Sequence, residues 1–314
     1  MRALFHHPSG PWLRQQLAAL ESDQLAIEIV AEADGPNLEE MLAKSDVLLH
    51  VLHPVSAAMM ARAPNLQLIQ KIGVGLDAID LEAARARNIA VCNMPGTNTQ
   101  AVVELTLGLM LSVLRGIPAL DDQLRRRGTW ALPPSAQGQF GEISGKVVGL
   151  VGYGHVSRRL EAVLDALGGT VLIHSRTAFS PAIGTCVPRQ ALLAQSDIVS
   201  LHVPETVETR NWLDAKAIDQ MKPGAVVINT ARGRLIDEKA MIAALKSGHL
   251  AGAGLDVFAQ EPLDRGSAIL SAPNVVALPH VAWLTRETLQ RSLDAARENI
   301  TRLRQGCALL NRHV

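Results

Sequence analysis

The sequence lacks an excess of charge of one sign, a cysteine framework and an early hydrophobic run. Its 30 Lys and Arg balance its 30 Asp and Glu, so no net field draws the chain to nucleic acid or to an acidic membrane surface. Three isolated cysteines fit neither a disulfide framework nor a metal-binding spacing. Met1 to Pro11 holds two His and two Pro, where a secretory signal needs apolar residues. We therefore expect a cytosolic protein without nucleic acid, membrane or metal partners.

Short apolar runs alternate with helical patterns in the first part of the chain. With 314 residues and 48% hydrophobic content, the chain is long enough to form two domains, each with its own core. Strands that alternate with helices indicate parallel pairing with crossover helices, and an α/β domain is predicted here. The expected strands are Ala3–Phe5, Leu25–Val30, Val47–Val51, Leu66–Ile72 and Ile89–Cys92.

An uninterrupted helical pattern extends from Thr99 to Arg127 and is apolar on much of its circumference. One small domain would struggle to bury such a surface, so we expect an interdomain or dimer helix. Its last three residues are arginines, and cations at a helix C-terminus complement the helix dipole rather than indicate a nucleic-acid site. The loop 128–145 follows, and in a dimer Trp130 would reach toward the cleft of the other subunit.

The segment from Lys146 to Ser157 carries a strand, a Gly-x-Gly turn and a helix start. Gly-x-Gly alone is a weak signal, but the strand before it, the helix after it and a second strand at Thr170–His174 complete a βαβ unit. The free amides at the helix N-terminus would face a pyrophosphate. Ser157 replaces the third glycine, and we expect this small residue to be tolerated there. The predicted dinucleotide contacts in this turn are Gly152, Gly154, His155 and Val156.

The end of the second strand indicates which coenzyme binds. Where an NAD site places Asp or Glu to accept from the ribose hydroxyls, this chain has Ser175, Arg176 and Thr177. These side chains offer donors and a bidentate cation to a 2′-phosphate that a carboxylate would repel. NADP(H) is the predicted coenzyme. NAD(H) is the alternative if Arg176 is only a solvated loop residue.

Three charged or titratable residues each follow an apolar, strand-like run. They are Arg232 after Ala225–Ile228, Glu261 after Ala253–Phe258 and His280 after Val275–Leu278. Because the carboxyl ends of parallel strands meet at one edge of a sheet, we expect the three side chains to lie at one crevice. Each alone has an ordinary structural explanation, but together, beside a dinucleotide motif, they favour catalysis. The set suits binding an anion and moving a proton to or from its oxygen.

The chain resembles the D-isomer-specific 2-hydroxyacid dehydrogenase family over nearly its whole length. The resemblance implies two doubly wound α/β domains with parallel sheets, a Rossmann coenzyme domain (99–284) inserted into a flavodoxin-like substrate domain (1–98 and 285–314). It also implies a homodimer built on the long helix. The motifs that carry it are Ile72–Asp77, Gly152–Gly154, Met221–Ala225, Asn229–Gly233, Gly254–Val257 and Pro279–His280.

The same resemblance implies roles for individual residues. Arg232 would hold the carboxylate and carbonyl of the substrate, His280 would be the acid/base and Glu261 its partner. Val74 and Gly75 resemble the backbone donors to the substrate carboxylate. The implied coenzyme contacts are Thr99 and Asp256 at the nicotinamide and His202, Val203 and Pro204 at the adenine. The further predicted coenzyme contacts are Thr209, Thr230, Ala231, Arg232 and His280.

Two further residues bear on the substrate. His53, before Pro54 at the end of a strand, could line the substrate side of the cleft. Trp283 lies three residues beyond His280, so it would cap the carbon-3 end of the substrate if the chain turns into a helix there. The alternative for Trp283 is packing at the domain interface. A bulky cap leaves space for hydrogen or hydroxymethyl, which favours glyoxylate and hydroxypyruvate.

The sequence therefore predicts NADPH-dependent reduction of a small 2-oxo acid, in a pattern similar to glyoxylate/hydroxypyruvate reductases. A broader NAD-dependent D-2-hydroxyacid dehydrogenase is the main alternative, and oxidation of phosphite or phosphoglycerate is a minor one. A non-catalytic, dinucleotide-sensing corepressor shares the fold. That class is disfavoured because the chain has no long polar tail or basic segment to assemble partners.

Overall fold

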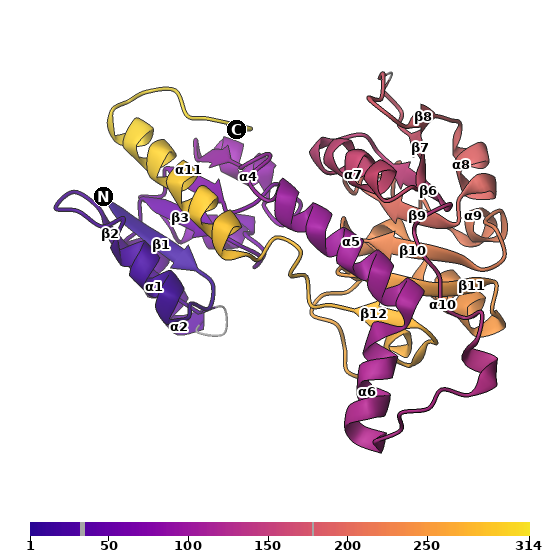
Figure 1. Ribbon diagram of the computed structural model, residues 1–314. Helices are drawn as coiled ribbons and strands as arrows, with labels where there is room; N and C mark the ends of the chain where they lie inside the picture. Colours follow the sequence, from indigo (N-terminus) through magenta and orange to yellow (C-terminus); the bar gives the residue numbers. More distant parts are fainter. Residues whose placement is uncertain (32–34, 178) are drawn as a thin grey trace. The chain divides into compact units, whose positions relative to one another are not determined.

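The computed structural model describes residues 1–31, 35–177 and 179–314. The chain forms two compact units: unit 1 is Met1–Asn98 with Leu284–Val314, and unit 2 is Thr99–Trp283. Each unit is built around one parallel sheet (Figure 1). The predicted fold class, two α/β domains of which one is inserted into the other, is confirmed.

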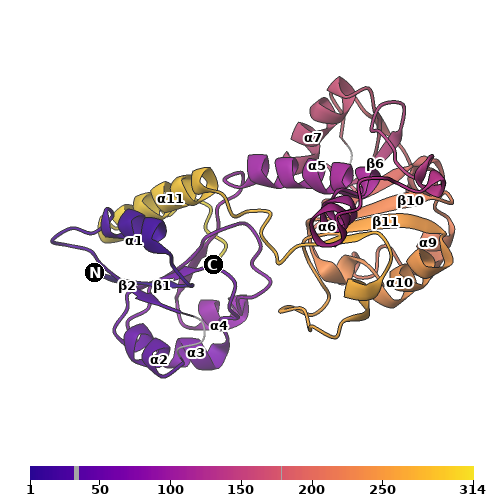
Figure 2. The ribbon, with the colours of Figure 1, turned by 60° about the horizontal axis from the view of Figure 1, so that its bottom comes forward.

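Unit 1 contains a five-stranded parallel sheet in the order β2-β1-β3-β4-β5, which is the flavodoxin-like order. Helices α1 and α11 cover one face, and α2, α3 and α4 cover the other (Figure 2). Strands β3, β4 and β5 are buried throughout because helices cover both faces of the sheet. The strands are β1 (Arg2–His6), β2 (Ala26–Val30), β3 (Val47–His50), β4 (Leu68–Lys71) and β5 (Ala90–Cys92), and the helices are α1 (Pro11–Ala18), α2 (Gly35–Ala43), α3 (Ala57–Ala61), α4 (Leu81–Ala86) and α11 (Arg286–Arg304).

Unit 2 contains a seven-stranded parallel sheet in the order β12-β11-β10-β9-β6-β7-β8. The order reverses between β6 and β9, which is the switch point where dinucleotides bind in a Rossmann fold. The strands are β6 (Val147–Val151), β7 (Thr170–His174), β8 (Thr185–Cys186), β9 (Ile198–Leu201), β10 (Ala225–Asn229), β11 (Leu250–Leu255) and β12 (Val275–Ala277).

The helices of unit 2 cover both faces of its sheet. Apolar side chains of α5 and α7 form one core with the sheet, and those of α8, α9 and α10 form the other. The helices are α5 (Thr99–Arg115), α6 (Ile117–Arg127), α7 (His155–Ala166), α8 (Arg189–Gln195), α9 (Ala215–Asp219) and α10 (Glu238–Ser247), and the short 3-10 turns are η1 (Pro134–Ala136), η2 (Gly233–Leu235) and η3 (Ala268–Ser271).

The prediction of one uninterrupted helix from Thr99 to Arg127 is wrong. The chain turns by 61° between α5 and α6, because Gly116 is left-handed (φ 59°) and Pro118 has no amide hydrogen to continue the helix. Helix α5 buries Val103, Leu109 and Met110 in the core of its own unit, whereas α6 buries no residue. Within the described residues, no single helix is long and apolar enough to cross a membrane, and only the bent pair α5 and α6 passes that test of length and composition.

Candidate active site

The turn between β6 and α7, which we call the phosphate turn (Gly152–Gly154), has the geometry of a dinucleotide site. Gly152 has φ +97°, and a Cβ there would lie 2.8 Å from the carbonyl oxygen of His202, so glycine is required. A Cβ on Gly154 would meet nothing within 4 Å, which leaves open space before α7. No side chain caps that helix, and its first amides can therefore bind a pyrophosphate. His155 is exposed at this end and Val156 is half-buried.

Ser157 lies on the inner side of α7. Its side chain is fully buried, and its Oγ has no hydrogen-bond partner within the described chain. The structure therefore gives this residue the packing role of the glycine that it replaces.

Ser175, Arg176 and Thr177 follow β7 directly. The Arg176 side chain is 64% exposed, and its Nη1 lies 3.9 Å from Oε2 of Glu208. An exposed ion pair at this distance contributes little free energy, so the guanidinium can reorient toward a phosphate. A hydrogen bond from the Thr206 hydroxyl, and then one from the backbone amide of Glu208 itself, lower the pKa of Glu208, and the Arg176 charge adds a smaller lowering.

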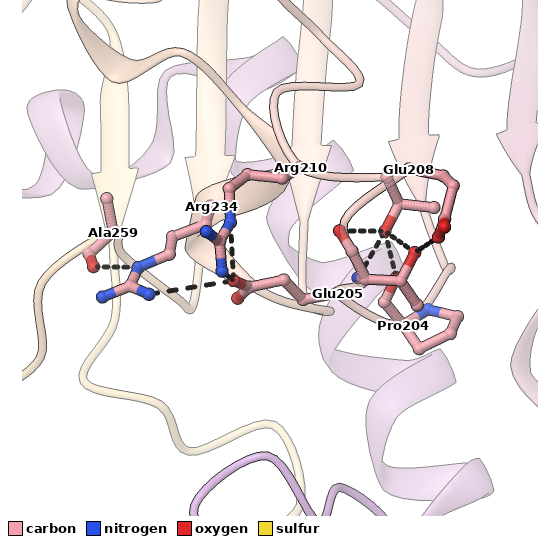
Figure 3. A network of polar contacts seen from close by, with 8 residues as sticks. Pro204, Glu205, Glu208, Arg210, Arg234 and Ala259 are labelled. Carbon is pink, nitrogen blue, oxygen red and sulfur yellow. Dashed lines mark hydrogen bonds and ion pairs between the residues drawn. The ribbon is translucent and has the colours of Figure 1, made fainter.

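At the carboxyl edge of the sheet, hydrogen bonds and ion pairs connect the loops that follow three neighbouring strands (Figure 3). Glu205, after β9, accepts a hydrogen bond of 2.9 Å from Arg210 and lies 3.9 Å from Nη1 of Arg234, after β10. Arg234 also donates from Nε to the carbonyl oxygen of Ala259, after β11, at 3.3 Å. The Arg234 side chain thus connects the loop after β9, where the adenine wall is predicted, with the loop after β11.

The loop after β9 is closed mainly by its own hydrogen bonds. The Thr209 hydroxyl donates to Pro204 O and accepts from the amide of Thr206, both at 2.7 Å. His202 Nε2 lies 2.9 Å from Oγ of Ser200, and burial lowers the pKa of His202 to about 4, so its imidazole is neutral. These contacts set the shape of the predicted adenine wall. The hydrogen bonds of the Thr209 hydroxyl are made to backbone atoms of the same loop.

Arg232 lies in a tight turn after β10. Asn229 accepts from the amide of Ala231 at 3.0 Å and donates to the carbonyl oxygen of Arg232 at 2.8 Å. A Cβ on Gly233 would lie 1.8 Å from the carbonyl carbon of Phe258, so only glycine lets this turn approach the loop after β11. Sequence reasoning did not foresee either role, although the glycine was a signal of a close approach.

Nearby in the same turn, the hydroxyls of Thr230 and Thr106 lie 3.0 Å apart. This contact joins the turn to α5, the helix that begins with Thr99. Helix α5 therefore supports the turn that carries Arg232. The coenzyme contacts expected of Thr99, Thr230 and Ala231 stay predictions.

Glu261 and His280 form a hydrogen-bonded pair of 2.6 Å between Oε2 and Nδ1. The amide of Phe258 donates to the other Glu261 oxygen at 2.9 Å. Burial alone raises the pKa of Glu261, but the His280 contact, the Phe258 amide and the charge of Arg232 together lower it below its ordinary value. The carboxyl group is therefore ionised and can only accept. Nδ1 of His280 must then carry a hydrogen, and Nε2 is left for a substrate.

Asp256 holds the backbone on which His280 is mounted. Its two carboxylate oxygens accept from the amides of Val281 and Ala282, both at 2.8 Å, and its carbonyl oxygen accepts from the amide of His280 at 2.9 Å. His280 is left-handed with φ 55°, a conformation that costs about 1 to 3 kcal/mol for a residue other than glycine. Burial raises the pKa of Asp256 although the two amides oppose this. The nicotinamide contact expected of Asp256 stays a prediction, and its support of His280 was missed.

Trp283 is the last residue of unit 2. The helical spacing expected between His280 and Trp283 is wrong, because α11 begins only at Arg286 and is capped by the Thr285 hydroxyl, which accepts from the Thr288 amide. The helical argument for a substrate cap therefore fails. The cap itself stays a prediction.

Val74 and Gly75 lie in the loop after β4 of unit 1. The carbonyl oxygen of Gly73 accepts from the amide of Met94 at 2.8 Å, and that of Val74 accepts from the Asn93 side chain at 2.9 Å. Within the described part of the chain, neither the Val74 amide nor the Gly75 amide donates a hydrogen bond. Both donors are therefore available to a carboxylate. No pattern in the sequence predicted that the Asn93 side chain would support this loop.

His53 belongs to a group of basic side chains at the carboxyl edge of the unit 1 sheet. Its ring centroid lies 5.0 Å from that of His6, and its carbonyl oxygen accepts from Nε2 of His50 at 2.6 Å. Burial, then the charge of Lys71, lower the pKa of His50 to about 3. The Lys71 ammonium donates to the carbonyl oxygen of Val51. Across residues 1–31, 35–177 and 179–314, no group of three or more His, Cys, Asp or Glu could hold a metal ion.

Known proteins resemble this chain in sequence. The family described as D-isomer specific 2-hydroxyacid dehydrogenase, NAD binding domain, matches residues 107–282. Glyoxylate reductase from Thermofilum pendens is 38% identical over 293 residues, which are 89% of this chain and 86% of the relative. D-3-phosphoglycerate dehydrogenase from Mycobacterium bovis is 36% identical over 297 residues, which are 90% of this chain but 54% of the relative. The chain thus spans about half the length of this mycobacterial relative.

Solved structures resemble the chain over its whole length. The TT0316 protein from Thermus thermophilus matches with a TM-score of 0.90 and 33% identity, and all of both chains is covered. An acyclic imino acid reductase in complex with NADPH and D-Arg matches with a TM-score of 0.86 and 26% identity, again over all of both chains. From the strand order, the phosphate turn and these matches together, it follows that the chain belongs to the D-isomer specific 2-hydroxyacid dehydrogenase family.

Proposed function

We propose that the protein reduces a small 2-oxo acid to the D-2-hydroxy acid with NADPH, and that His280 donates the proton. The observation that carries this proposal is the hydrogen bond of 2.6 Å between His280 Nδ1 and the ionised Glu261, with Arg232 close enough to lower the pKa of that carboxylate. Relatives named glyoxylate reductase and glycerate dehydrogenase support a substrate of this class.

The chemistry follows from the roles of these side chains. A bound nicotinamide coenzyme would supply a hydride to the carbonyl carbon. Negative charge then grows on the carbonyl oxygen, where the guanidinium of Arg232 and the Nε2 hydrogen of His280 stabilise it more than they stabilise the ground state. Glu261 favours the protonated imidazole that gives up this hydrogen. The amides of Val74 and Gly75 are the proposed donors to the substrate carboxylate.

The preference for NADPH rests on the residues after β7. Ser175, Arg176 and Thr177 put two hydroxyls and an exposed cation where an NAD site would place an acid. One similar structure holds NADPH, while the description of the matched family names NAD. The alternative is therefore a broader D-2-hydroxyacid dehydrogenase that uses NAD, in which Arg176 remains in solvent.

A second candidate substrate is a 2-oxo or 2-hydroxy acid with a distal anionic group. Lys71 is buried, and its aliphatic chain packs beside Gly73, one residue before the Val74 and Gly75 amides. A cation at this point would suit a phosphate, and a D-3-phosphoglycerate dehydrogenase is among the relatives. A phosphorylated 2-oxo acid therefore belongs in the test.

We further propose a homodimer that covers the surface around α6. Ile117 and Leu124 on this helix are exposed, as are Leu132 and Trp130 in the loop after it, with Trp130 at 87%. Monomeric proteins rarely leave contiguous apolar patches in water. Sedimentation at micromolar concentration should show a dimer, and a monomer there would remove this proposal together with the expected role of Trp130 at a partner's cleft. The cytosolic location stays an expectation.

Initial rates with a panel of 2-oxo acids test the proposed activity. Glyoxylate, hydroxypyruvate, pyruvate, phenylpyruvate and 3-phosphohydroxypyruvate would each be measured with NADPH and with NADH, and the product's configuration would be determined. We expect the highest kcat/KM for glyoxylate or hydroxypyruvate with NADPH, and the D configuration in the chiral products, since glycolate from glyoxylate has no stereocentre. Highest activity with the phosphorylated acid would favour the second candidate. Background rates with every acid would exclude the reductase.

A further inference from the structure

Tyr153, the chain's only tyrosine, joins the phosphate turn to the loop between β7 and β8. We call this loop 175–184, and its described residues are 175–177 and 179–184. Its hydroxyl donates to Oε1 of Glu161 at 2.7 Å and accepts from the amide of Ala182 at 3.2 Å. Its ring lies 4.4 Å, centroid to centroid, from that of Phe179. Phe179 and Ala182 both belong to the loop that begins with Ser175 and Arg176. One side chain of the phosphate turn therefore holds the far part of this loop.

Glu161 completes this arrangement from α7. The residue is fully buried, its Oε1 also accepts from the Ala182 amide at 3.3 Å, and its Oε2 has no hydrogen-bond partner within the described chain. Leu160 and Leu164, which share the buried face of α7, are apolar. An acid in such a face is unfavourable unless specific hydrogen bonds offset its burial. The bonds to Tyr153 and Ala182 are the ones that the structure provides.

The tyrosine is suited to act as a permanent donor. Burial, and then the hydrogen bond to Glu161, raise the pKa of Tyr153 above its ordinary value. Its phenol therefore keeps its hydrogen throughout the neutral range. Tyr153 therefore remains a hydrogen-bond donor under the conditions in which a reductase would be assayed.

The loop 175–184 is thus fastened at both ends. At its start, the amide of Gly152 donates to the carbonyl oxygen of His174 at 2.7 Å. At its far end, Tyr153 and Glu161 hold Ala182. Between these points the Arg176 side chain is exposed, with an ion pair to Glu208 at 3.9 Å. Such an exposed pair is too weak to fix the place of Arg176. The backbone is held by these two contacts and, directly after the loop, by the pairing of β8 with β7.

We infer that Tyr153 and Glu161 are positioning residues that set the coenzyme preference, because they hold the loop 175–184 where Arg176 faces the 2′-phosphate of NADPH. The inference rests on the proposed use of NADPH. Tyr153 and Glu161 would affect the preference for NADPH through the position of Arg176, and neither side chain would contact the 2′-phosphate itself. A loop released from this pair would let Arg176 sample positions away from the phosphate, while the phosphate turn itself would keep its shape through Gly152.

Tyr153→Phe is the central variant, since it removes the hydroxyl and keeps the ring on Phe179. The ratio of kcat/KM for NADPH to that for NADH should fall about five-fold, the scale of one lost hydrogen bond. The increase in KM should be larger for NADPH than for NADH. Glu161→Gln keeps an acceptor oxygen and should retain most of the ratio. Glu161→Leu should lower it as Tyr153→Phe does.

An Arg176→Ala background separates positioning from packing. If Tyr153 acts through Arg176, then Tyr153→Phe changes nothing further in that background. Hydrogen exchange at the Ala182 amide should be faster in Tyr153→Phe than in the parent protein, which reports the released loop independently of activity.

Three results overturn the inference in distinguishable ways. An unchanged ratio in Tyr153→Phe, when Arg176→Ala abolishes the preference, removes the inference and leaves the NADPH proposal standing. An equal loss with both coenzymes, or the same loss without Arg176, shows that Tyr153 only supports the phosphate turn. A parent protein that does not prefer NADPH removes both the coenzyme proposal and the inference.

Discussion

Two groups of loops at the same edge of the seven-stranded sheet are held very differently. The loops after β10, β11 and β12 fix Arg232, Glu261 and His280 through side-chain bonds to the backbone, a glycine contact and a buried aspartate. The loop after β7 presents Arg176, which is 64% exposed and has a long ion pair. Proton transfer needs reacting groups held within a fraction of an ångström. Choosing a coenzyme needs only a cation within reach of a phosphate.

The comparison implies that removing a substrate-contacting side chain or the close backbone contact in the first group should have larger effects than substitutions in the second. When a side chain is removed from a fixed site, its interaction partners lose their contact and cannot rearrange to form another. Loss of an exposed cation removes one interaction and little else.

A large effect on both kcat and KM is expected for Arg232→Ala. The substitution removes both a contact to the substrate carboxylate and the charge beside the developing oxyanion, so kcat should fall by about 10² to 10³ and KM for the acid should rise. Arg232→Lys is the matched control, and it should recover only part of the loss because an ammonium cannot form the bidentate contact. Steady-state kinetics with glyoxylate would measure both. Unchanged KM in Arg232→Ala would contradict the assigned binding role.

Gly233→Ala should disrupt the same loops through the backbone. A Cβ at this position would overlap the carbonyl carbon of Phe258, at 1.8 Å, so the loops must separate. We expect a loss of about 3 kcal/mol or more in the free energy of unfolding, and loss of activity. Gly108→Ala on α5 is the control, because a Cβ there meets nothing within 4 Å, and alanine in a helix is favoured over glycine by roughly 0.5 to 1 kcal/mol. Equal stability of the two variants in urea unfolding would refute the close approach.

Arg176→Ala should have a smaller effect that is confined to one coenzyme. Binding of NADPH should weaken by about 1.5 to 3 kcal/mol, while binding of NADH should hardly change. Glu208→Gln is the opposite probe, since it removes the acid beside Arg176, and it should tighten NADPH by about two-fold. Fluorescence titration of both coenzymes would measure these constants. Equal losses for NADPH and NADH in Arg176→Ala would show that Arg176 does not bind the 2′-phosphate.

The smallest change is expected in the pH profile of Glu261→Gln. The folded-state pKa of Glu261 lies below its ordinary value, so the carboxylate is charged above that value and loses its charge only as the pH falls through the lowered pKa. A neutral glutamine no longer favours the imidazolium of His280. The alkaline limb of the reduction profile should therefore move to lower pH. An unmoved limb would mean that Glu261 only supports the loop.

Much of the fold followed from the sequence because strand and helix alternate with clear periods. Once the sheets are parallel, the ends of successive strands must share an edge, which is why the pair of Glu261 and His280 could be anticipated. The break at Gly116 was also visible, since a glycine two residues before Pro118 is a helix stop signal. The continuous apolar pattern was given more weight than that signal, and the prediction was wrong.

The supporting contacts could not be anticipated in the same way. Asp256 accepts from amides 25 and 26 residues along the chain, and Glu161 meets Ala182 across a loop. Such contacts depend on loop conformations that no periodicity encodes. The direction of Trp283 depended on whether a helix follows His280, and the hydrogen bonds of Asp256 hold an irregular turn there instead.

Replacement of His280 by alanine tests the central claim most directly, because it removes the proton donor from the site and leaves the phosphate turn and Arg176 untouched. The parent protein and His280→Ala would be compared for NADPH affinity and for reduction of glyoxylate. We expect equal affinity for NADPH and a fall in kcat of about 10² to 10⁴. Full turnover in His280→Ala, with NADPH bound as before, would contradict the assignment of His280 as the acid.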